Sequence, residues 1–358
     1  SNSSVISLMI NLFVGISVGA NVVIANYIGQ GKTEKIQDAV HTVMIISLIS
    51  GVFLLVLGLM IARPILEIMG TPENVIDLAV LYLHIYFLGM PFLMIYNFGA
   101  AVLRSKGDTK RPLYCLIISG VINACLNLLF VIVFKLSVAG VAIATVIADG
   151  VSAVLIIYFL MNEEETIRLR LNKLKIKKSE LIKVIKIGVP AGLQGVVFSV
   201  SNVCIQTAIN SFGSDVIAGY SAAIKLNTFA ITSFSTLGNA MSSYTAQNTG
   251  ARKLLRIPEG LKAGIVMLIV VSLPFFIAYF VFPNTMMNIF VKSSEAGIID
   301  VGRIFLKIVT PFYFVISAKL TFDGILRGAG RMRAFMASTF TDLLLRVILA
   351  YVFSYALN

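Results

Sequence analysis

Short sequence motifs recur at long range in this chain, and this internal repeat constrains its fold more than any other feature. Three motifs of the first half return about 220 residues later. The pairs are residues 25–29 with 246–250, residues 103–107 with 326–330, and Pro91-Phe92 with Pro311-Phe312. In an apolar chain, such a repeat predicts two homologous bundles of membrane helices, an arrangement typical of proteins that move a substrate between their halves.

The composition indicates that lipid is the solvent for most of the chain. Hydrophobic residues make up 58% of the sequence and charged residues 13%, whereas soluble domains carry about 25% charged residues. The three cysteines lie in apolar runs, without the spacing of a disulfide framework or a metal site. No pairing of a nucleophile with a base points to an enzyme. We therefore expect a polytopic membrane protein with no catalytic residues, no metal and no other cofactor.

Ten segments are long and apolar enough to span a bilayer, which takes about 20 residues each. They are residues 4–28, 39–60, 75–103, 113–134, 139–161, 187–211, 216–246, 261–282, 298–326 and 334–357. The repeat is offset by six segments, and an even offset predicts that both halves cross the membrane in the same direction. The fold class that we predict is all-α, with two homologous, parallel six-helix lobes. The full protein would have twelve helices, of which this chain holds about ten, because the first and last have no counterpart here.

The lobes are expected at residues 1–161 and 187–358, joined by a basic linker at residues 162–186. Lysine and arginine gather in this linker and in one set of loops, which the positive-inside rule places on the cytoplasmic side. We therefore predict a multi-pass protein of the bacterial cytoplasmic membrane. Topology also accounts for the net charge of +12, so no nucleic-acid partner is expected. Two interpretations of the linker remain open: a solvated connector and an amphipathic helix on anionic lipid.

The motifs resemble those of the multidrug and toxic compound extrusion (MATE) family. The resemblance rests on the order and spacing of residues 17–29, 103–109, Pro190, 246–251 and 324–330. It implies twelve helices in two six-helix lobes, which agrees with the repeat. It also implies export of lipophilic, often cationic compounds, driven by the inward flow of protons or sodium ions.

Polar residues at membrane depth are costly and are often functional. In the first lobe these are Asn123, Asn127, Thr145 and Asp149. The family resemblance implies a cation site made by an Asn-x-x-x-Asp pair, a threonine on the next helix and an aspartate on the first helix. Asn123 and Thr145 match this pattern, whereas Asn127 stands where the pattern has aspartate. Our hypothesis is that Asp149 replaces the lost carboxylate and binds the coupling ion; the alternative is a structural polar network between helices.

The second lobe holds two charge pairs at i, i+4 spacing, Lys319 with Asp323 and Asp342 with Arg346. Each pair can neutralise itself on one helical face, or the two can form a network that rearranges during transport. Lys225 has no local acid. It either tunes substrate choice from the cavity or pairs with an acid on another helix.

The helix after the linker carries a row of polar side chains, Gln194, Asn202, Gln206 and Asn210. We expect them to line a central substrate cavity, with helix packing as the alternative. The same helix lacks the membrane-embedded glutamate found in several families of this type. A second-lobe sodium site is therefore not carried over by the resemblance.

Residues 29–33 resemble the end of a phosphate-binding loop, but they follow a predicted membrane helix and not a strand, so no ATP site is expected. The predicted function is a secondary antiporter, working as a monomer, that exports lipophilic and cationic small molecules in exchange for H⁺ or Na⁺ by alternating access. The alternatives are a flippase for lipid-linked precursors and a non-transporting membrane receptor or scaffold. A flippase would require a strongly basic cavity.

Overall fold

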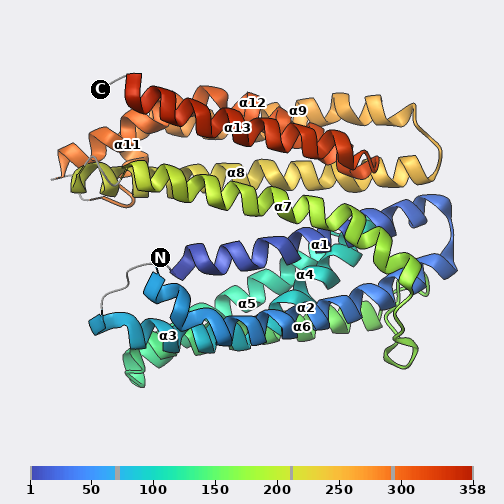
Figure 1. The fold of residues 1–358 in the computed structure, drawn as a ribbon. Helices are drawn as coiled ribbons and strands as arrows, with labels where there is room; N and C mark the ends of the chain where they lie inside the picture. The colour runs from blue at the N-terminus through green and yellow to red at the C-terminus, as the bar shows by residue number, and fades with distance from the viewer. Residues whose placement is uncertain (1, 69–72, 210–212, 292–294, 357–358) are drawn as a thin grey trace. The chain divides into compact units, whose positions relative to one another are not determined.

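The computed structural model describes residues 2–68, 73–209, 213–291 and 295–356, and every regular element within these ranges is helical (Figure 1). The chain divides into two compact units, Ser1–Ser199 and Val200–Asn358. The division falls within helix α7, Lys178–Ile209. Each unit has a hydrophobic core of its own. The predicted all-α, two-unit fold is confirmed for the residues described.

The first unit is built around helix α4, Met90–Ser105. It packs against three other helices, α1, α2 and α6, and its Met94, Phe98 and Leu103 are fully buried. The elements of this unit are α1 Asn2–Gln30, α2 Thr33–Ile68, α3 Glu73–Leu88, α4, α5 Lys110–Leu128 with a π-helical end at Leu129–Val133, α6 Ser137–Met161, a 3₁₀ turn at Leu171–Lys173 and the first part of α7.

Helices α1 and α7 approach so closely that only glycine fits where they meet. A Cβ on Gly15 would lie 2.1 Å from the Cα atom of Gly192, and one on Gly19 would lie 2.7 Å from the Cα atom of Gly188. Small residues let membrane helices pack by van der Waals contact, because lipid offers no hydrophobic driving force between them. The glycines therefore fix the first part of α7 to the first unit.

The second unit is centred on α8, Ser214–Gly250, and α12, Tyr313–Gly328. A Cβ on Gly324 would lie 2.0 Å from the carbonyl oxygen of Gly238, so these two helices also meet through glycine. Phe234 and Tyr313 lie in the core with ring centroids 5.4 Å apart. The other elements are the end of α7, α9 Arg256–Phe276 with a π-helical end at Ile277–Val281, α10 Pro283–Met287, α11 Ala296–Val309, a 3₁₀ turn at Thr310–Phe312 and α13 Met332–Ala356.

Each of the ten predicted spans coincides with helix, but two of them are broken. Helices α3 and α4 meet at an angle of 44° around Gly89, and Pro91 lies in the first turn of α4. The predicted span 298–326 is likewise divided into α11 and α12 by a 3₁₀ turn that contains Pro311. Proline has no backbone N–H to donate, so it interrupts the helical hydrogen bonds. The repeat thus places a helix break at equivalent points of both units.

Length and hydropathy alone identify six helices that can cross a membrane, or seven if α3 and α4 count as one bent span. This number applies to the described residues and is lower than the ten predicted. The helices left out belong to the second unit, where α8 is rich in Ser, Thr and Asn and where α12 and α13 carry charges. Large apolar side chains are exposed along the helices, for example Phe53 on α2 and Ile117 on α5. Such surfaces fit a bilayer and not water.

The segment between α6 and α7 is shorter than the predicted linker and is held against the first unit. Helix α7 begins at Lys178, inside the predicted linker. The backbone N–H of Leu169 donates to the carbonyl oxygen of Leu160 at 2.9 Å, and that of Arg170 donates to Nε2 of His41 at 3.2 Å. The segment is therefore a connector that is hydrogen-bonded to the first unit, and apart from the 3₁₀ turn at Leu171–Lys173 it is not helical.

Glu163 anchors the start of this segment in a cluster of charges, where its buried carboxylate is surrounded by partly exposed charged side chains. Its side chain is only 4% exposed; its Oε1 accepts a hydrogen bond from Nζ of Lys106 at 3.0 Å, and its Oε2 pairs with Arg111, which also pairs with Asp108. Burial opposes ionisation of Glu163, but hydrogen bonds from the backbone N–H of Glu164 and from the two cations outweigh it. They hold the pKa of Glu163 below its usual range.

Acid is expected to weaken this cluster. A carboxyl group whose pKa is lower in the folded state contributes stability above its unfolded pKa and loses it as the pH falls through its folded pKa. The melting temperature in detergent should therefore fall once the pH drops below about 4.5, the usual value for glutamate. Glu163→Gln should lower the free energy of unfolding by about 2 kcal/mol at neutral pH, the typical value of a hydrogen bond to a charged group. The melting temperature of this variant should also fall less steeply as the pH is lowered.

The matched control is Glu164→Gln. The Glu164 side chain pairs with Lys106 at 2.9 Å but is 74% exposed, and exposed ion pairs contribute little. Melting curves recorded from pH 3 to pH 7 should separate the two variants. An unchanged acid profile in Glu163→Gln would show that the cluster does not stabilise the fold.

Candidate functional site

A chain of hydrogen bonds joins α5 and α6 in the first unit and contains three of the predicted ion-coupling residues. Nδ2 of Asn127 donates to Oδ1 of Asn123 at 2.9 Å, and Nδ2 of Asn123 donates to Oγ1 of Thr145 at 3.3 Å. The Thr145 hydroxyl in turn donates to the carbonyl oxygen of Val141 at 3.0 Å. Oδ1 of Asn127 is buried and accepts no hydrogen bond from the described residues. A bound cation or water could satisfy this oxygen.

Asp149, the fourth predicted residue, lies at a different level of the same helix pair. Helices α5 and α6 are joined by a short turn and run antiparallel, so Asn127 and Asp149 lie on opposite sides of the Asn123–Thr145 contact. Each is one turn away from that contact, which places them about 12 Å apart along the helix axes. Asp149 is therefore a separate carboxylate and does not take the position of the aspartate that Asn127 replaces.

The Asp149 carboxylate faces the break between α3 and α4. A Cβ on Gly89 would lie 3.5 Å from Oδ2 of Asp149, and the side chain is half-buried. Within the described ranges, no residue donates a hydrogen bond to this carboxylate. An acid that has no fixed partner inside an apolar helix can accept a proton or bind a cation at modest cost.

In the second unit, Lys319 connects two helices through two acids. Its Nζ lies 3.0 Å from Oδ2 of Asp323 on α12 and 3.3 Å from Oδ2 of Asp342 on α13. The Asp323 side chain is only 3% exposed, whereas that of Asp342 is 46% exposed. Arg346, the predicted partner of Asp342, is half-buried on α13 and lies near both Asp342 and Tyr220. The predicted pairs thus share one cluster in space.

Arg327 lies in the repeated Leu-Arg-x-x-Gly motif and is not among the site residues predicted from the sequence. Its side chain is buried, its Nη2 donates to Oδ1 of Asn239 at 3.2 Å, and its guanidinium lies 5.6 Å from the ring centroid of Phe335. The motif served as a marker of the repeat, but its arginine also ties α12 to α8 and α13.

The predicted cavity residues are distributed along α7 and α8. Gln194 is half-buried and Asn202 is exposed. The side chain of Gln206 and the whole of Asn210 lie outside the described residues. Lys225 is exposed on α8, and its Nζ lies 5.7 Å from the ring centroid of Phe290, a cation–π distance.

Comparison with known proteins identifies the family. A family model described as MatE matches residues 2–129 and 190–352. The chain belongs to the MatE family. This assignment confirms the resemblance on which the sequence analysis relied. The family consists of membrane transporters and not enzymes.

Relatives with curated descriptions agree with this assignment. The chain is 30% identical to the probable multidrug resistance protein YoeA of Bacillus subtilis over 80% of its own length, but the match spans only 64% of that protein. It is 24% identical to the probable multidrug resistance protein NorM of Thermotoga maritima, where the match covers 93% of this chain and 72% of the relative. The MatE chain thus spans less than two thirds of the YoeA protein.

A solved structure of a multidrug resistance MATE family transporter in an outward-facing conformation superposes with a TM-score of 0.91. The superposition covers 98% of this chain and 78% of the solved chain, at 22% sequence identity. At this identity the likeness shows the fold alone.

Proposed function

We propose that the protein is a secondary antiporter that exports lipophilic, cationic small molecules in exchange for an inward flow of H⁺ or Na⁺. The observation that carries the proposal is Asp149, a half-buried carboxylate on an apolar helix of a MatE chain. A charge at the centre of a membrane helix costs about 2.5–3.5 kcal/mol on insertion scales. A role in binding and releasing the coupling ion accounts for this cost.

The location of Asp149 suggests how the ion would be coupled to conformation. The carboxylate lies beside Gly89, where α3 ends and α4 begins at an angle of 44°. A broken helix can change its angle at low cost, because the backbone hydrogen bonds are already interrupted there. Protonation or cation binding at Asp149 would change the charge next to this break. An ion shifts a conformational equilibrium only if it binds the two states differently, so the proposal requires Asp149 to bind the ion more tightly at one angle of this break than at the other.

The polar chain Asn123–Asn127–Thr145 supports the same function from one turn away. Oδ1 of Asn127, which accepts no hydrogen bond from the described residues, is an oxygen ligand of the kind that hard cations prefer. We place the basic loops on the cytoplasmic side of a bacterial plasma membrane, as the positive-inside rule predicts. The transporter would act as a monomer, without ATP or another cofactor.

The test is gradient-driven transport by the full-length protein in proteoliposomes. Export of a fluorescent lipophilic cation is followed under an imposed proton gradient and, in parallel, under a sodium gradient. We expect accumulation against the concentration gradient of the dye under one of the two, and that gradient identifies the ion. If folded protein accumulates no dye under either gradient, the antiport proposal is wrong for this substrate class. The alternatives are then a lipid-linked substrate or an anion, which Lys225 would contact.

A further inference from the structure

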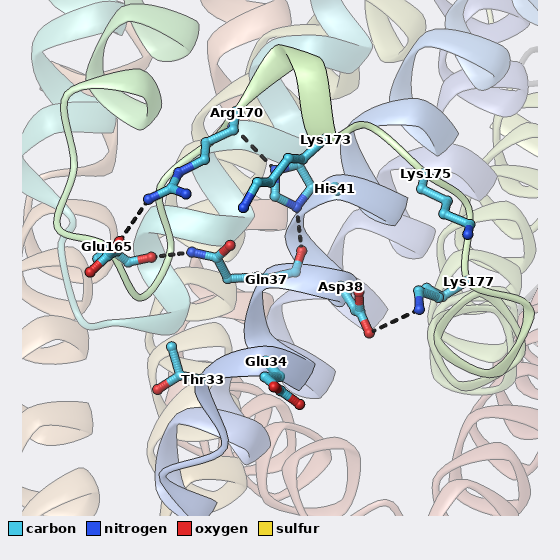
Figure 2. Close-up of a pocket in the computed structure, with 10 residues that line it drawn as sticks. All are labelled: Thr33, Glu34, Gln37, Asp38, His41, Glu165, Arg170, Lys173, Lys175 and Lys177. Carbon is cyan, nitrogen blue, oxygen red and sulfur yellow. Dashed lines mark hydrogen bonds and ion pairs between the residues drawn. The ribbon is translucent and has the colours of Figure 1, made fainter.

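A pocket of about 600 Å³ opens in the first unit, outside the transport site proposed above (Figure 2). One wall is the N-terminal end of α2, from Thr33 to His41. The other wall is the segment between α6 and α7, from Glu165 to Lys177. The volume lies within the range of about 300–1,000 Å³ that small-ligand sites occupy.

The pocket is held open by hydrogen bonds that tie the segment to α2. Nδ1 of His41 donates to the carbonyl oxygen of Gln37 at 2.7 Å, while its Nε2 accepts the backbone N–H of Arg170 at 3.2 Å. Further along the segment, Oγ1 of Thr42 accepts the backbone N–H of Lys177 at 3.0 Å and donates to the carbonyl oxygen of Lys175 at 3.3 Å. The walls are therefore in place before a ligand arrives, which lowers the cost of binding.

Four cations line the pocket, and only two of them are neutralised. Arg170 pairs with Glu165 at 2.7 Å and Lys177 pairs with Asp38 at 3.6 Å. Lys173 and Lys175 also line the pocket (Figure 2). Neither ammonium group has an ion pair or a hydrogen bond with any residue in the described part of the chain. Three carboxylates, Glu34, Asp38 and Glu165, line the same pocket, so its lining carries one net positive charge. The ammonium groups of Lys173 and Lys175 are left to attract an anion with several acceptor oxygens, such as a phosphate group.

The position of the pocket along α2 places it at the membrane surface. Residues 42–62 of α2 contain no acid, base or histidine. This run of about 21 residues measures about 31 Å, which matches the hydrocarbon core of a bilayer. His41 then stands at the edge of the hydrocarbon, and the residues back to Thr33 rise about 12 Å beyond it. The lipid headgroups occupy the first 5–8 Å or so of this zone.

The segment itself has the composition of a membrane-surface element. Leu171, Leu174 and Ile176 are 55%, 40% and 41% exposed, and they alternate with the pocket lysines. Apolar side chains that are exposed beside unpaired lysines suit the boundary between acyl chains and headgroups. A soluble phosphate ester would make no use of them.

We propose that this pocket binds the phosphate group of an anionic phospholipid, with Lys173 and Lys175 as its charged ligands. The exposed leucines and isoleucine contact the upper acyl chains of the same lipid. The bound lipid fastens the segment between α6 and α7 to the membrane surface. The site is independent of the ion site at Asp149, so either proposal can fail without the other.

The chain itself offers a reporter for the test, because it contains no tryptophan. Leu174→Trp introduces an indole beside the pocket, and any tryptophan of the full-length protein outside residues 1–358 is replaced by phenylalanine. The protein is reconstituted in phosphatidylcholine bilayers that contain a small fraction of either brominated phosphatidylglycerol or brominated phosphatidylcholine. Bromine quenches tryptophan only at close range, so excess quenching by the brominated phosphatidylglycerol measures its enrichment at the pocket.

We expect this enrichment to fall about 20- to 30-fold when Lys173→Gln and Lys175→Gln are combined, since each hydrogen bond from a lysine to the bound phosphate contributes about 1 kcal/mol. The control combines Lys178→Gln and Lys186→Gln, which removes the same charge from exposed residues outside the pocket and should leave the enrichment within about twofold. Glu34→Gln, which removes a negative charge from the lining, should raise the enrichment about twofold. Misfolding would not produce such a gain.

Three results would overturn the proposal. The first is equal quenching of the tryptophan fluorescence by the two brominated lipids. The second is an equal loss of phosphatidylglycerol enrichment in the two variants that each replace two lysines. The third concerns a soluble ligand: glycerol 3-phosphate would bind the protein in phosphatidylcholine nanodiscs through Lys173 and Lys175, without enrichment of phosphatidylglycerol. That result would assign the pocket to a soluble phosphate ester.

Discussion

Asp149→Asn is expected to abolish export against a concentration gradient and to leave the protein folded. Asparagine has nearly the same shape as aspartate but cannot take up a proton or hold a cation by charge. Because no described residue donates a hydrogen bond to the Asp149 carboxylate, the substitution breaks no hydrogen bond of this side chain. Removing an unpaired acid from an apolar helix should even raise stability by about 1–3 kcal/mol. In proteoliposomes, dye accumulation should fall to the level that is reached without a gradient.

The control for this variant is Asp300→Asn. Asp300 is exposed on α11 and pairs with Arg303 at 3.0 Å, so its loss should leave transport within about twofold of wild type. Thr145→Val provides a second comparison, because it breaks the polar chain to Asn123 without touching the carboxylate. We expect Thr145→Val to weaken ion affinity and to retain coupling. Full, gradient-dependent accumulation by Asp149→Asn would remove Asp149 from the mechanism.

Lys319→Met is expected to have the largest effect on stability. Lys319 supplies the ammonium group 3.0 Å from Asp323, whose side chain is 3% exposed. Removal of one partner of a buried ion pair typically costs about 3–5 kcal/mol, because the other charge stays buried. Lys319 itself is 28% exposed, and the buried Arg327 also interacts with Asp323, so we expect a loss near the lower end, about 3 kcal/mol. Unfolding in detergent, measured against denaturant, provides the free energy.

A double variant shows whether the loss comes from the Asp323 carboxylate that has lost Lys319. Lys319→Met combined with Asp323→Leu replaces the pair by apolar side chains and should recover most of the stability. Asp342→Asn removes the other acid, which is 46% exposed, and should cost less than about 1 kcal/mol. If Lys319→Met and Asp342→Asn lose equal stability, the cluster is not organised around the buried Asp323.

The sequence predicts the helices and the family of this protein well, because these depend on local patterns. Apolar runs locate each helix, and Pro91 and Pro311 mark the points where two of them break. The first break lies at Gly89, just before Pro91, because a proline is accepted in the first turn of a helix but not in its interior. The close contact of Gly15 with Gly192 joins helices that are far apart in sequence.

The candidate sites are predicted less completely, because they depend on the rotation and register of neighbouring helices. The i, i+4 rule places Asn123 beside Asn127, and the structure adds the contact between Asn123 and Thr145 across two helices. The same register moves Asp149 a turn away from this contact. Lys319 likewise reaches both its own helix and Asp342 on the next. Sequence spacing alone predicts the contacts within one helix of such a cluster, but not the contacts between helices.

The measurement that tests the central claim most directly is the release of the coupling ion when substrate binds. Purified full-length protein is mixed with a lipophilic cation in weakly buffered detergent, and released protons are followed with a pH indicator; released sodium is followed in parallel with ²²Na⁺. Antiport through Asp149 predicts that wild type releases one of these ions on substrate binding and that Asp149→Asn releases neither, while Asp300→Asn behaves as wild type. Equal ion release by wild type and Asp149→Asn would contradict the assignment of Asp149 as the coupling residue.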